Sequence, residues 1–305
     1  MVCVGMGPDW MNQQKIVIKI PQSVRSDYKG YYSLLSNFRW YLDCDASEIT
    51  LNFRANTWFD ANLLPIVYAY IRHGKKSGIG SVYDNQRDCP LHRLLLRNNF
   101  AKECFDLPYQ PRREETVVPF KIFRAEATYQ FADYIDAQLI RYFPAMEDRV
   151  KRDLSTYIQE VFGNAQIHGG CKRVYTCGQY YHKQQKMDFT IVNLGTTIGE
   201  NVTVFLGEQR IPLPSHNISW AVEPEHSTKR THSGGIGLSL MRDFIHFNHG
   251  KYQIVSGKEY WELNGQRIQE RTLPAPFPGT IVNIEINQND KSYYQYGDTD
   301  DDPVF

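Results

Sequence analysis

Apolar residues follow two different spacings in the first half of the chain. Residues 63–78 repeat apolar side chains at helical spacing and end at Gly78, which predicts an amphipathic helix. Residues 89–105 predict a second helix, with Pro90 suited to its first turn and leucines on one face. Three short β-prone runs predict strands: IVIKI at 16–20, EITLNF at 48–53 and GSVYD at 80–84. The order strand, strand, helix, strand, helix predicts a mixed α/β domain.

A segment rich in proline and charge interrupts this pattern. LPYQPRREETV, at residues 107–117, lacks apolar periodicity and predicts a linker with a domain boundary near residue 115. The expected domains are therefore residues 1–115 and 116–305. The second domain begins with two predicted helices, 126–143 and 148–168, followed by predicted strands at 174–181 and 187–194. These elements predict a second α/β layer structure.

Length and composition narrow the class of protein. At 305 residues, the chain has room for two domains of roughly 100–200 residues each. It contains no run of 18 apolar residues that could span a bilayer, and its start lacks a secretory signal. We therefore expect a soluble, cytoplasmic protein without a membrane partner. Lysine plus arginine equals aspartate plus glutamate at 34 each, so the charge gives no signal for direct nucleic-acid binding.

The six cysteines contain no CxxC pair, which argues against a zinc ribbon or a thioredoxin-like redox site. We expect reduced, mostly buried thiols. Cys171 and Cys177 flank a predicted turn, and pairing or reaction between them stays open at this point. The acidic tail at residues 297–302 is too poor in apolar residues to pack, so we expect a frayed and solvated end.

Four segments of the second half carry candidate chemistry. In the predicted helix 155–170, Glu160 and Asn164 are four residues apart and share one face. A carboxylate there can activate a water, and an amide oxygen one turn later can complete the oxygen shell of Mg²⁺ around phosphates. The alternative is an exposed glutamate and asparagine with no function.

The other three segments contain glycines or end in strands. Residues 188–199 form a predicted strand that leads into a glycine-bearing loop, with Asn193 and Gly195 at its end. Residues 231–257 place a Gly-Gly-x-Gly turn before a helix, whose amino end can bind an anion. A plain turn or cap is the alternative there. Residues 277–286 form a predicted strand on which Thr280 could bond a base edge.

The order and spacing of these segments resemble the N, G1, G2 and G3 boxes of the GHKL superfamily, which includes DNA gyrase, histidine kinases and mismatch-repair ATPases. The resemblance covers residues 150–286. Within it, EVFGNAQIHGG is most similar to the anti-sigma-factor serine kinases, which carry glutamate, asparagine four residues later, and histidine at the position of His168.

This resemblance implies an α/β fold of the Bergerat type, in which a mixed sheet faces helices and ATP with Mg²⁺ lies between helix and lid. Glu160 becomes the catalytic carboxylate, Asn164 the Mg²⁺ ligand and Gly195 the floor under adenine. The stretch 199–233 becomes the lid, although Lys229 and Arg230 could equally be solvated and His168 could bond backbone carbonyls. The remaining implied nucleotide contacts are Asn193, Lys229, Arg230, Gly234, Gly235, Ile236, Gly237, Leu238, Thr280 and His168.

One position departs from the family pattern. The G1 box usually begins with an aspartate that accepts a hydrogen bond from the adenine amino group, and Asn193 stands there instead. Its carbonyl can still accept that bond, but the loss of charge assistance removes roughly 1 kcal/mol. The usual second glycine of the box is also missing, with Thr196 and Thr197 nearby.

The segment 48–100 resembles the core of a STAS domain, in which a strand ends in an Asp-Ser turn before a helix. Here Asp60 is followed by Ala61, so the phosphoacceptor hydroxyl is missing. We therefore expect a smaller STAS-like α/β domain that docks a protein partner or forms a homodimer.

Two functions follow from this interpretation. The first is an ATPase or serine/threonine protein kinase with Glu160 as base, which switches a protein partner. The second is a scaffold that senses nucleotide without turnover. A histidine-kinase role is disfavoured because no helical hairpin with an exposed histidine precedes residue 150.

Overall fold

The computed structural model describes residues 14–42, 46–75, 80–84, 90–111, 116–224, 226, 228, 236–296 and 303–304. Its first part is built on a parallel sheet in the order β1-β3-β5, formed by Gln14–Lys19, Ala46–Asn52 and Gly80–Asp84. All three predicted strands of the first half are present. The acidic tail at 297–302 lies outside the described residues.

A helix that the sequence analysis missed connects the first two of these strands. α1 (Tyr28–Leu42) buries Tyr31, Leu34, Leu35 and Phe38, which follow helical spacing. The predicted order strand, strand, helix was therefore wrong at this point. Parallel neighbours need a crossover connection, and α1 supplies it between β1 and β3.

The remaining elements of this part follow the predicted pattern with one break. α2 (Leu64–Lys75) comes directly after a single 3₁₀ turn, η1 (Ala61–Leu63). The single helix expected over 89–105 is two helices, α3 (Pro90–Arg97) and α4 (Phe100–Phe105). Asn99 between them has a φ of 68°, in the left-handed region, which ends one helix and starts another. A two-residue parallel pair joins β2 (Ser23–Val24) and β4 (Trp58–Phe59).

A five-stranded sheet forms the centre of the second part, in the order β6-β7-β8-β10-β9. Its neighbours are antiparallel throughout, so the expected mixed sheet was wrong. Short turns explain this difference, because they join β7 to β8 and β9 to β10 and force each pair to run in opposite directions. The strands are β6 (Val117–Arg124), β7 (Arg173–Tyr181), β8 (Lys186–Leu194), β9 (Lys251–Asn264) and β10 (Arg267–Asn287).

Helices precede and interrupt this sheet. α5 (Thr128–Gln138), η2 (Ile140–Tyr142) and α6 (Asp148–Ile167) follow β6 and agree with the two helices predicted there. Between β8 and β9 lie α7 (Ile198–Gln209), α8 (Asn217–Ala221) and α9 (Ile236–Asn248). The chain ends with the short pair β11 (Gln295–Tyr296) and β12 (Pro303–Val304). At this level the protein is an α/β protein.

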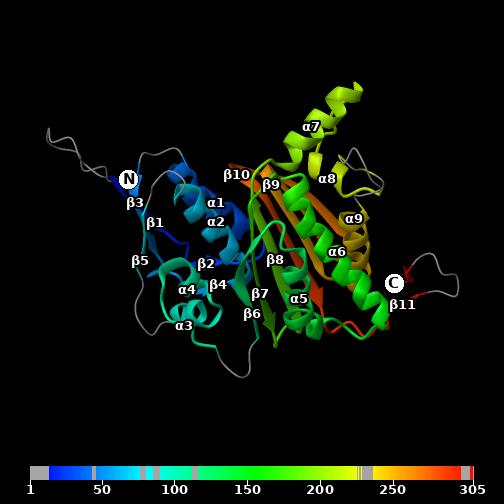
Figure 1. The fold of residues 1–305 in the computed structure, drawn as a ribbon, viewed down its shortest axis with the longest axis horizontal. Coiled ribbons are helices and arrows are strands. Elements are labelled where there is room, and N and C mark those ends of the chain that lie inside the picture. The colour runs from blue at the N-terminus through cyan, green and yellow to red at the C-terminus, as the bar shows by residue number, and fades with distance from the viewer. Residues whose placement is uncertain are drawn as a thin grey trace.

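Both faces of the five-stranded sheet are covered, by different parts of the chain. Helices α5, α6 and α9 lie on one face, while α1 and α2 of the first part lie on the other (Figure 1). Side chains of β8 alternate accordingly, since Ile191 packs with α6 and α9 whereas Val192 packs with the first part. The first predicted domain thus packs its apolar core against one face of the sheet of the second, and the helices of the second form a separate core on the other face.

The cysteines that the structure describes lie on different faces of the sheet. Cys104, Cys171 and Cys177 are buried free thiols, as expected. Cys177 belongs to the core on the face of the first part and Cys171 to the core on the helical face. The sheet therefore separates the two thiols, and the pairing left open by the sequence does not occur. No described helix is long and apolar enough to cross a membrane.

Candidate functional site

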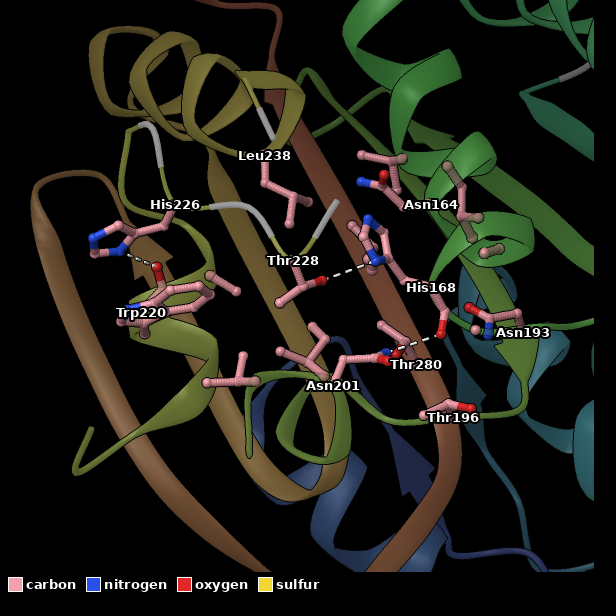
Figure 2. Close-up of a pocket in the computed structure, with 18 residues that line it drawn as sticks. Asn164, His168, Asn193, Thr196, Asn201, Trp220, His226, Thr228, Leu238 and Thr280 are labelled. Carbon is pink, nitrogen blue, oxygen red and sulfur yellow. Dashed lines mark hydrogen bonds between the residues drawn. The ribbon is translucent and has the colours of Figure 1, made fainter. Parts of the chain in front are cut away.

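A pocket opens on the helical face of the sheet, beside the carboxyl end of α6 (Figure 2). It encloses about 780 Å³ of empty space, including its open mouth. Its walls come from α6, the facing ends of β8 and β10, α7, α8, the segment after α8 and the first turns of α9. The lining residues are Val161, Asn164, Ala165, His168, Gly169, Ile191, Asn193, Thr196, Ile198, Asn201, Val202, Trp220, Ala221, His226, Thr228, Leu238, Thr280 and Val282.

A close backbone approach fixes the floor of the pocket. The Thr196 N–H donates to the Gly169 carbonyl at 3.0 Å, which holds the end of β8 against the end of α6. A Cβ at Gly195 would lie 1.9 Å from that carbonyl oxygen, and its φ of 147° also favours glycine. Gly195 was predicted to form the floor under a base, but it is not a lining residue. Its role is to allow this approach, and Thr196 lines the pocket instead.

The part of β10 that faces the end of β8 is held in the same way. A Cβ at Gly279 would lie 2.0 Å from the Asn193 carbonyl oxygen, so only glycine lets β10 come this close to β8. The next residue, Thr280, pairs with Asn193 in the sheet register. Ser256 of β9 donates to the Gly279 carbonyl at 2.9 Å and lies 3.0 Å from the Thr280 hydroxyl. Thr280 and Asn193 therefore face the pocket side by side, as predicted.

Asn193 is the most unusual polar group of the pocket. Its side chain is only 5% exposed, and its Nδ2 atom is buried with no hydrogen-bond partner among the described residues. An ideal Cβ on Gly169 would lie 2.5 Å from this nitrogen, so the amide lies flat against the end of α6. A buried amide without partners is destabilising by about 1–3 kcal/mol unless something else satisfies it. The position indicates a binding group rather than a structural one.

Helix α7 begins at the pocket and is anchored on three sides. Thr197 and Glu200 form a capping box, with the Glu200 carboxylate accepting from the Thr197 N–H at 2.7 Å. These hydrogen bonds hold the pKa of Glu200 below its usual value. Ile198 N–H donates to Ser256, and the Asn201 amide donates to the His168 carbonyl at 2.9 Å. The predicted lid thus contains two helices, and its first helix is fastened to the sheet and to α6.

His168 connects the end of α6 to the segment that follows α8. Its Nδ1 lies 2.9 Å from the Thr228 hydroxyl, and its ring lines the pocket (Figure 2). His168 is also the residue that ends α6. The ring contacts a side-chain hydroxyl rather than a backbone carbonyl, and the predicted contact with phosphates stays a prediction. The His168 carbonyl accepts from Asn201 of α7.

Glu160 and Asn164 lie on the face of α6 that meets α9. A Cβ at Gly237 would lie 2.4 Å from Glu160 Oε2, so the carboxylate lies directly against the first turn of α9. Asn164, one turn further along α6, lines the pocket, whereas Glu160 is not a lining residue. The structure thus brings the predicted base, the predicted metal ligand and Gly237 to one place. Gly237 permits this contact, because any side chain there would displace Glu160.

Four predicted nucleotide contacts, Lys229, Arg230, Gly234 and Gly235, lie outside the described residues, and so does the side chain of Ile236. Leu238, which follows in α9, lines the pocket as part of its apolar wall.

No sequence pattern indicated the residues of α8 that line the pocket. Trp220 lines it and stacks on His226, with ring centroids 4.6 Å apart and planes within 13°. Glu259 of β9 anchors α8 by accepting from the Ile218 N–H at 3.0 Å and from the Asn217 amide at 2.5 Å. Only the tertiary structure brings β9 and α8 together, so neither Trp220 nor Glu259 could be found from spacing.

The described lining is neutral and mostly apolar. It contains no aspartate, glutamate, lysine or arginine, and its polar side chains are amides, hydroxyls and imidazoles. Within the described part of the chain, no three metal-ligating side chains gather. An apolar pocket with a few convergent polar groups suits a flat organic ligand. A metal ion here would depend on oxygens that the ligand brings.

Comparison with known proteins gives no relative for this chain, because neither the protein-family models nor the curated proteins contain a match.

Proposed function

We propose that this chain binds Mg·ATP, with the base in the apolar pocket and the phosphates at the amino end of α9. The observation that carries the proposal is a convergence in space. Four segments that lie apart in the sequence, and that resemble the four boxes of the GHKL superfamily, border one pocket. A Bergerat-type nucleotide site, preceded by a STAS-like region, is the fold that this arrangement supports best.

The base end is supported by the pocket walls. Val161, Ala165, Ile191 and Val282 offer apolar surface to a flat heterocycle, and Asn193 and Thr280 offer polar groups to its edge. Asn193 has a buried nitrogen that needs a partner, which is the condition for a group that recognises a ligand.

The phosphate end is supported by a helix amino terminus beside two oxygen-bearing side chains. α9 directs its positive end to the region where Glu160 and Asn164 lie. Magnesium usually keeps several waters and binds through phosphates with one or two protein oxygens. The Asn164 carbonyl oxygen fits one such position, and the phosphates would supply the rest. Mg²⁺ arrives with the nucleotide as part of the substrate.

In the enzyme version of the proposal, Glu160 accepts a proton from water or from a protein hydroxyl that attacks the γ-phosphate. The bond between the γ-phosphorus and the β–γ bridging oxygen breaks, and ADP leaves. Transfer to a serine or threonine makes the protein a kinase, and transfer to water, which yields inorganic phosphate, makes it an ATPase. In the alternative version, the chain holds nucleotide without turnover and switches a protein partner by binding alone. The missing carboxylate at Asn193 favours this alternative, since it weakens the recognition of adenine.

Thermal unfolding with and without Mg·ATP tests the binding proposal. A ligand that binds only the folded state stabilises it by about 2.7 kcal/mol at a hundredfold excess over the dissociation constant, so the melting temperature should rise. Asn164→Ala should remove the part of the rise that depends on Mg²⁺ and keep the part seen with ATP and EDTA. No rise at millimolar Mg·ATP contradicts the proposal.

A further inference from the structure

Asn193 determines what edge of a base this pocket can recognise. Its side-chain amide carries one acceptor oxygen and one NH₂ donor, whereas an aspartate in the same place offers acceptors only. The Nδ2 atom of this amide is buried with no hydrogen-bond partner among the described residues. No hydrogen bond of that nitrogen therefore opposes a 180° turn of the amide about its last bond, which exchanges its donor and acceptor ends.

The neighbours of Asn193 do not impose a direction either. Thr280 and Thr196 carry hydroxyls, which donate or accept as the partner requires. Thr280 contacts Ser256, another hydroxyl, at 3.0 Å, where either atom can be the donor. The described lining contains no carboxylate that would demand a donor from the ligand and no ammonium or guanidinium that would demand an acceptor.

Purine bases differ in the hydrogen-bond donors and acceptors that they present at position 6 and N1. A 6-aminopurine presents an NH₂ donor beside the N1 acceptor, and a 6-oxopurine presents a carbonyl acceptor beside the N1–H donor. Because one end of the Asn193 amide is buried beside Gly169, the other end meets the base. In one orientation the amide oxygen accepts from the 6-amino group, and after a 180° turn the amide NH₂ donates to the 6-oxo group. A carboxylate can accept from the 6-amino group but cannot donate to the 6-oxo group, whose carbonyl oxygen it repels.

We infer that the pocket accepts 6-oxopurine nucleotides as well as ATP, and that Asn193 is the residue that sets this breadth. The inference rests on the proposed function, because it concerns the base end of the same nucleotide site. It names the substrate class more closely: a purine nucleoside triphosphate whose position 6 carries either an amino or an oxo group.

The test measures dissociation constants by calorimetry for the magnesium complexes of ATP, ITP, GTP and CTP. ATP and ITP differ only at the purine edge that Asn193 would face. For the wild type, the affinities for ATP and ITP should lie within about tenfold of each other. Binding of GTP alongside ITP identifies guanine as an accepted base, and binding of ITP alone restricts the site to a 6-oxopurine without the 2-amino group. CTP should bind at least tenfold more weakly than either purine.

Asn193→Asp should make the pocket discriminate between ATP and ITP. The ratio of ATP to ITP affinity should rise by about 10–100-fold, since the oxo edge then loses a hydrogen bond and meets a charge. Asn164→Asp is the matched control, because it adds the same charge at the other end of the pocket. It should change both affinities by a similar factor and leave their ratio unchanged.

The outcomes separate the two proposals. No binding of any purine nucleotide contradicts the proposed function itself. Wild-type protein that binds ATP at least a hundredfold more tightly than ITP overturns the inference alone, and so does an affinity ratio that Asn193→Asp leaves unchanged in a folded protein. Circular dichroism and the melting temperature of each variant establish that it is folded.

Discussion

Two groups of buried polar side chains, one on each face of the five-stranded sheet, differ in whether other side chains satisfy them. On the face covered by the first part of the chain, Asn62 donates to Asn283 at 2.9 Å and Thr190 donates to the same oxygen at 2.7 Å. Asn283 in turn donates to Gln253. On the helical face, the Asn193 amide has a buried nitrogen with no partner in the described structure.

This difference shows which polar residues maintain the fold and which are available to a ligand. A buried polar network whose members satisfy one another specifies how two surfaces fit. A buried polar group without a partner raises the free energy of the folded state, so it persists where another property depends on it. The first face therefore joins the two parts of the chain, and the second face holds the candidate site.

Asp60, in the segment that resembles a STAS domain in sequence, is also held by buried hydrogen bonds on this face of the sheet. Asp60 accepts from the Ser26 N–H at 2.7 Å, from the Trp58 indole at 2.7 Å and from the Tyr181 hydroxyl of β7 at 2.9 Å. Ala61, which stands where that family has serine, is buried as well. The turn faces the sheet of its own chain rather than a surface open to a separate partner.

Three substitutions test whether the two faces have separate roles. The largest effect is expected at Glu160, on the helical face. Glu160→Gln keeps the size of the side chain beside Gly237 but removes the base. If the protein hydrolyses or transfers phosphate, the rate should fall by about 10²–10⁴-fold, which corresponds to roughly 3–5 kcal/mol of barrier. ATP affinity and the free energy of unfolding should barely change.

Steady-state phosphate release or transfer from labelled ATP measures this effect. Retention of the rate within about threefold would make Glu160 an ordinary helix residue. A wild-type protein that binds Mg·ATP without any turnover would instead favour the nucleotide-sensing scaffold.

The second effect concerns stability and the opposite face. Asn62→Ala removes an amide that contacts Ser26, Thr190 and Asn283. The Ser26 hydroxyl loses its side-chain partner, and Thr190 and Asn283 keep only the bond between them and the bond to Gln253. The free energy of unfolding should fall by about 2–4 kcal/mol. Asn164→Ala is the matched control, because that side chain lines the pocket and makes no such bonds. It should change the stability by less than about 0.5 kcal/mol.

Urea unfolding measures both variants. Equal losses for Asn62→Ala and Asn164→Ala would contradict the division between the two faces.

The smallest effect concerns pH, through Asp188 on the face of the first part. Burial, with a contribution from nearby Glu285, raises the pKa of Asp188 from 3.8 to about 7, although Lys186 lies 3.2 Å away. The Glu285 carboxylate has the opposite shift, since its ion pairs with Lys251 and Lys186 outweigh its burial and lower its pKa. The folded protein therefore takes up a proton at Asp188 that the unfolded chain releases near pH 4.

The direction in which stability changes with pH follows from this proton uptake. Between about pH 4 and pH 7 the folded state binds more protons than the unfolded state, so this group makes the protein less stable as the pH rises. Asp188→Asn should remove that contribution. The variant should gain about 1–3 kcal/mol relative to the wild type between pH 5 and pH 8, as measured by urea unfolding at both values. An unchanged difference between the two pH values would show that Asp188 is ionised throughout.

Elements whose apolar residues follow a regular helical or strand spacing were predicted well from the sequence. α2, α6 and the strands β7 and β8 lie where their patterns placed them. α1 was missed, although Tyr31, Leu34, Leu35 and Phe38 follow helical spacing, because aromatic residues and Gly30 obscure the pattern. β6 was also missed, since its residues follow directly after the predicted linker.

The candidate site was predicted in part. Asn164, His168, Asn193, Leu238 and Thr280 line the pocket, and Glu160 lies beside Gly237. Trp220, His226, Asn201 and Thr228 were not predicted. Their contacts are made between elements far apart in the chain, so no spacing within one segment could indicate them.

The sequence by itself determined the local elements and the residue types that could bind a nucleotide, because period and side-chain chemistry are local properties. Only the tertiary structure decided the direction of the strands, the close approach of Gly195 to Gly169 and the face on which each polar side chain lies. Those features depend on which surfaces pack together. The same residue type, asparagine, is held within a network at position 62 and left without a partner at position 193, because the two positions meet different neighbours across the sheet.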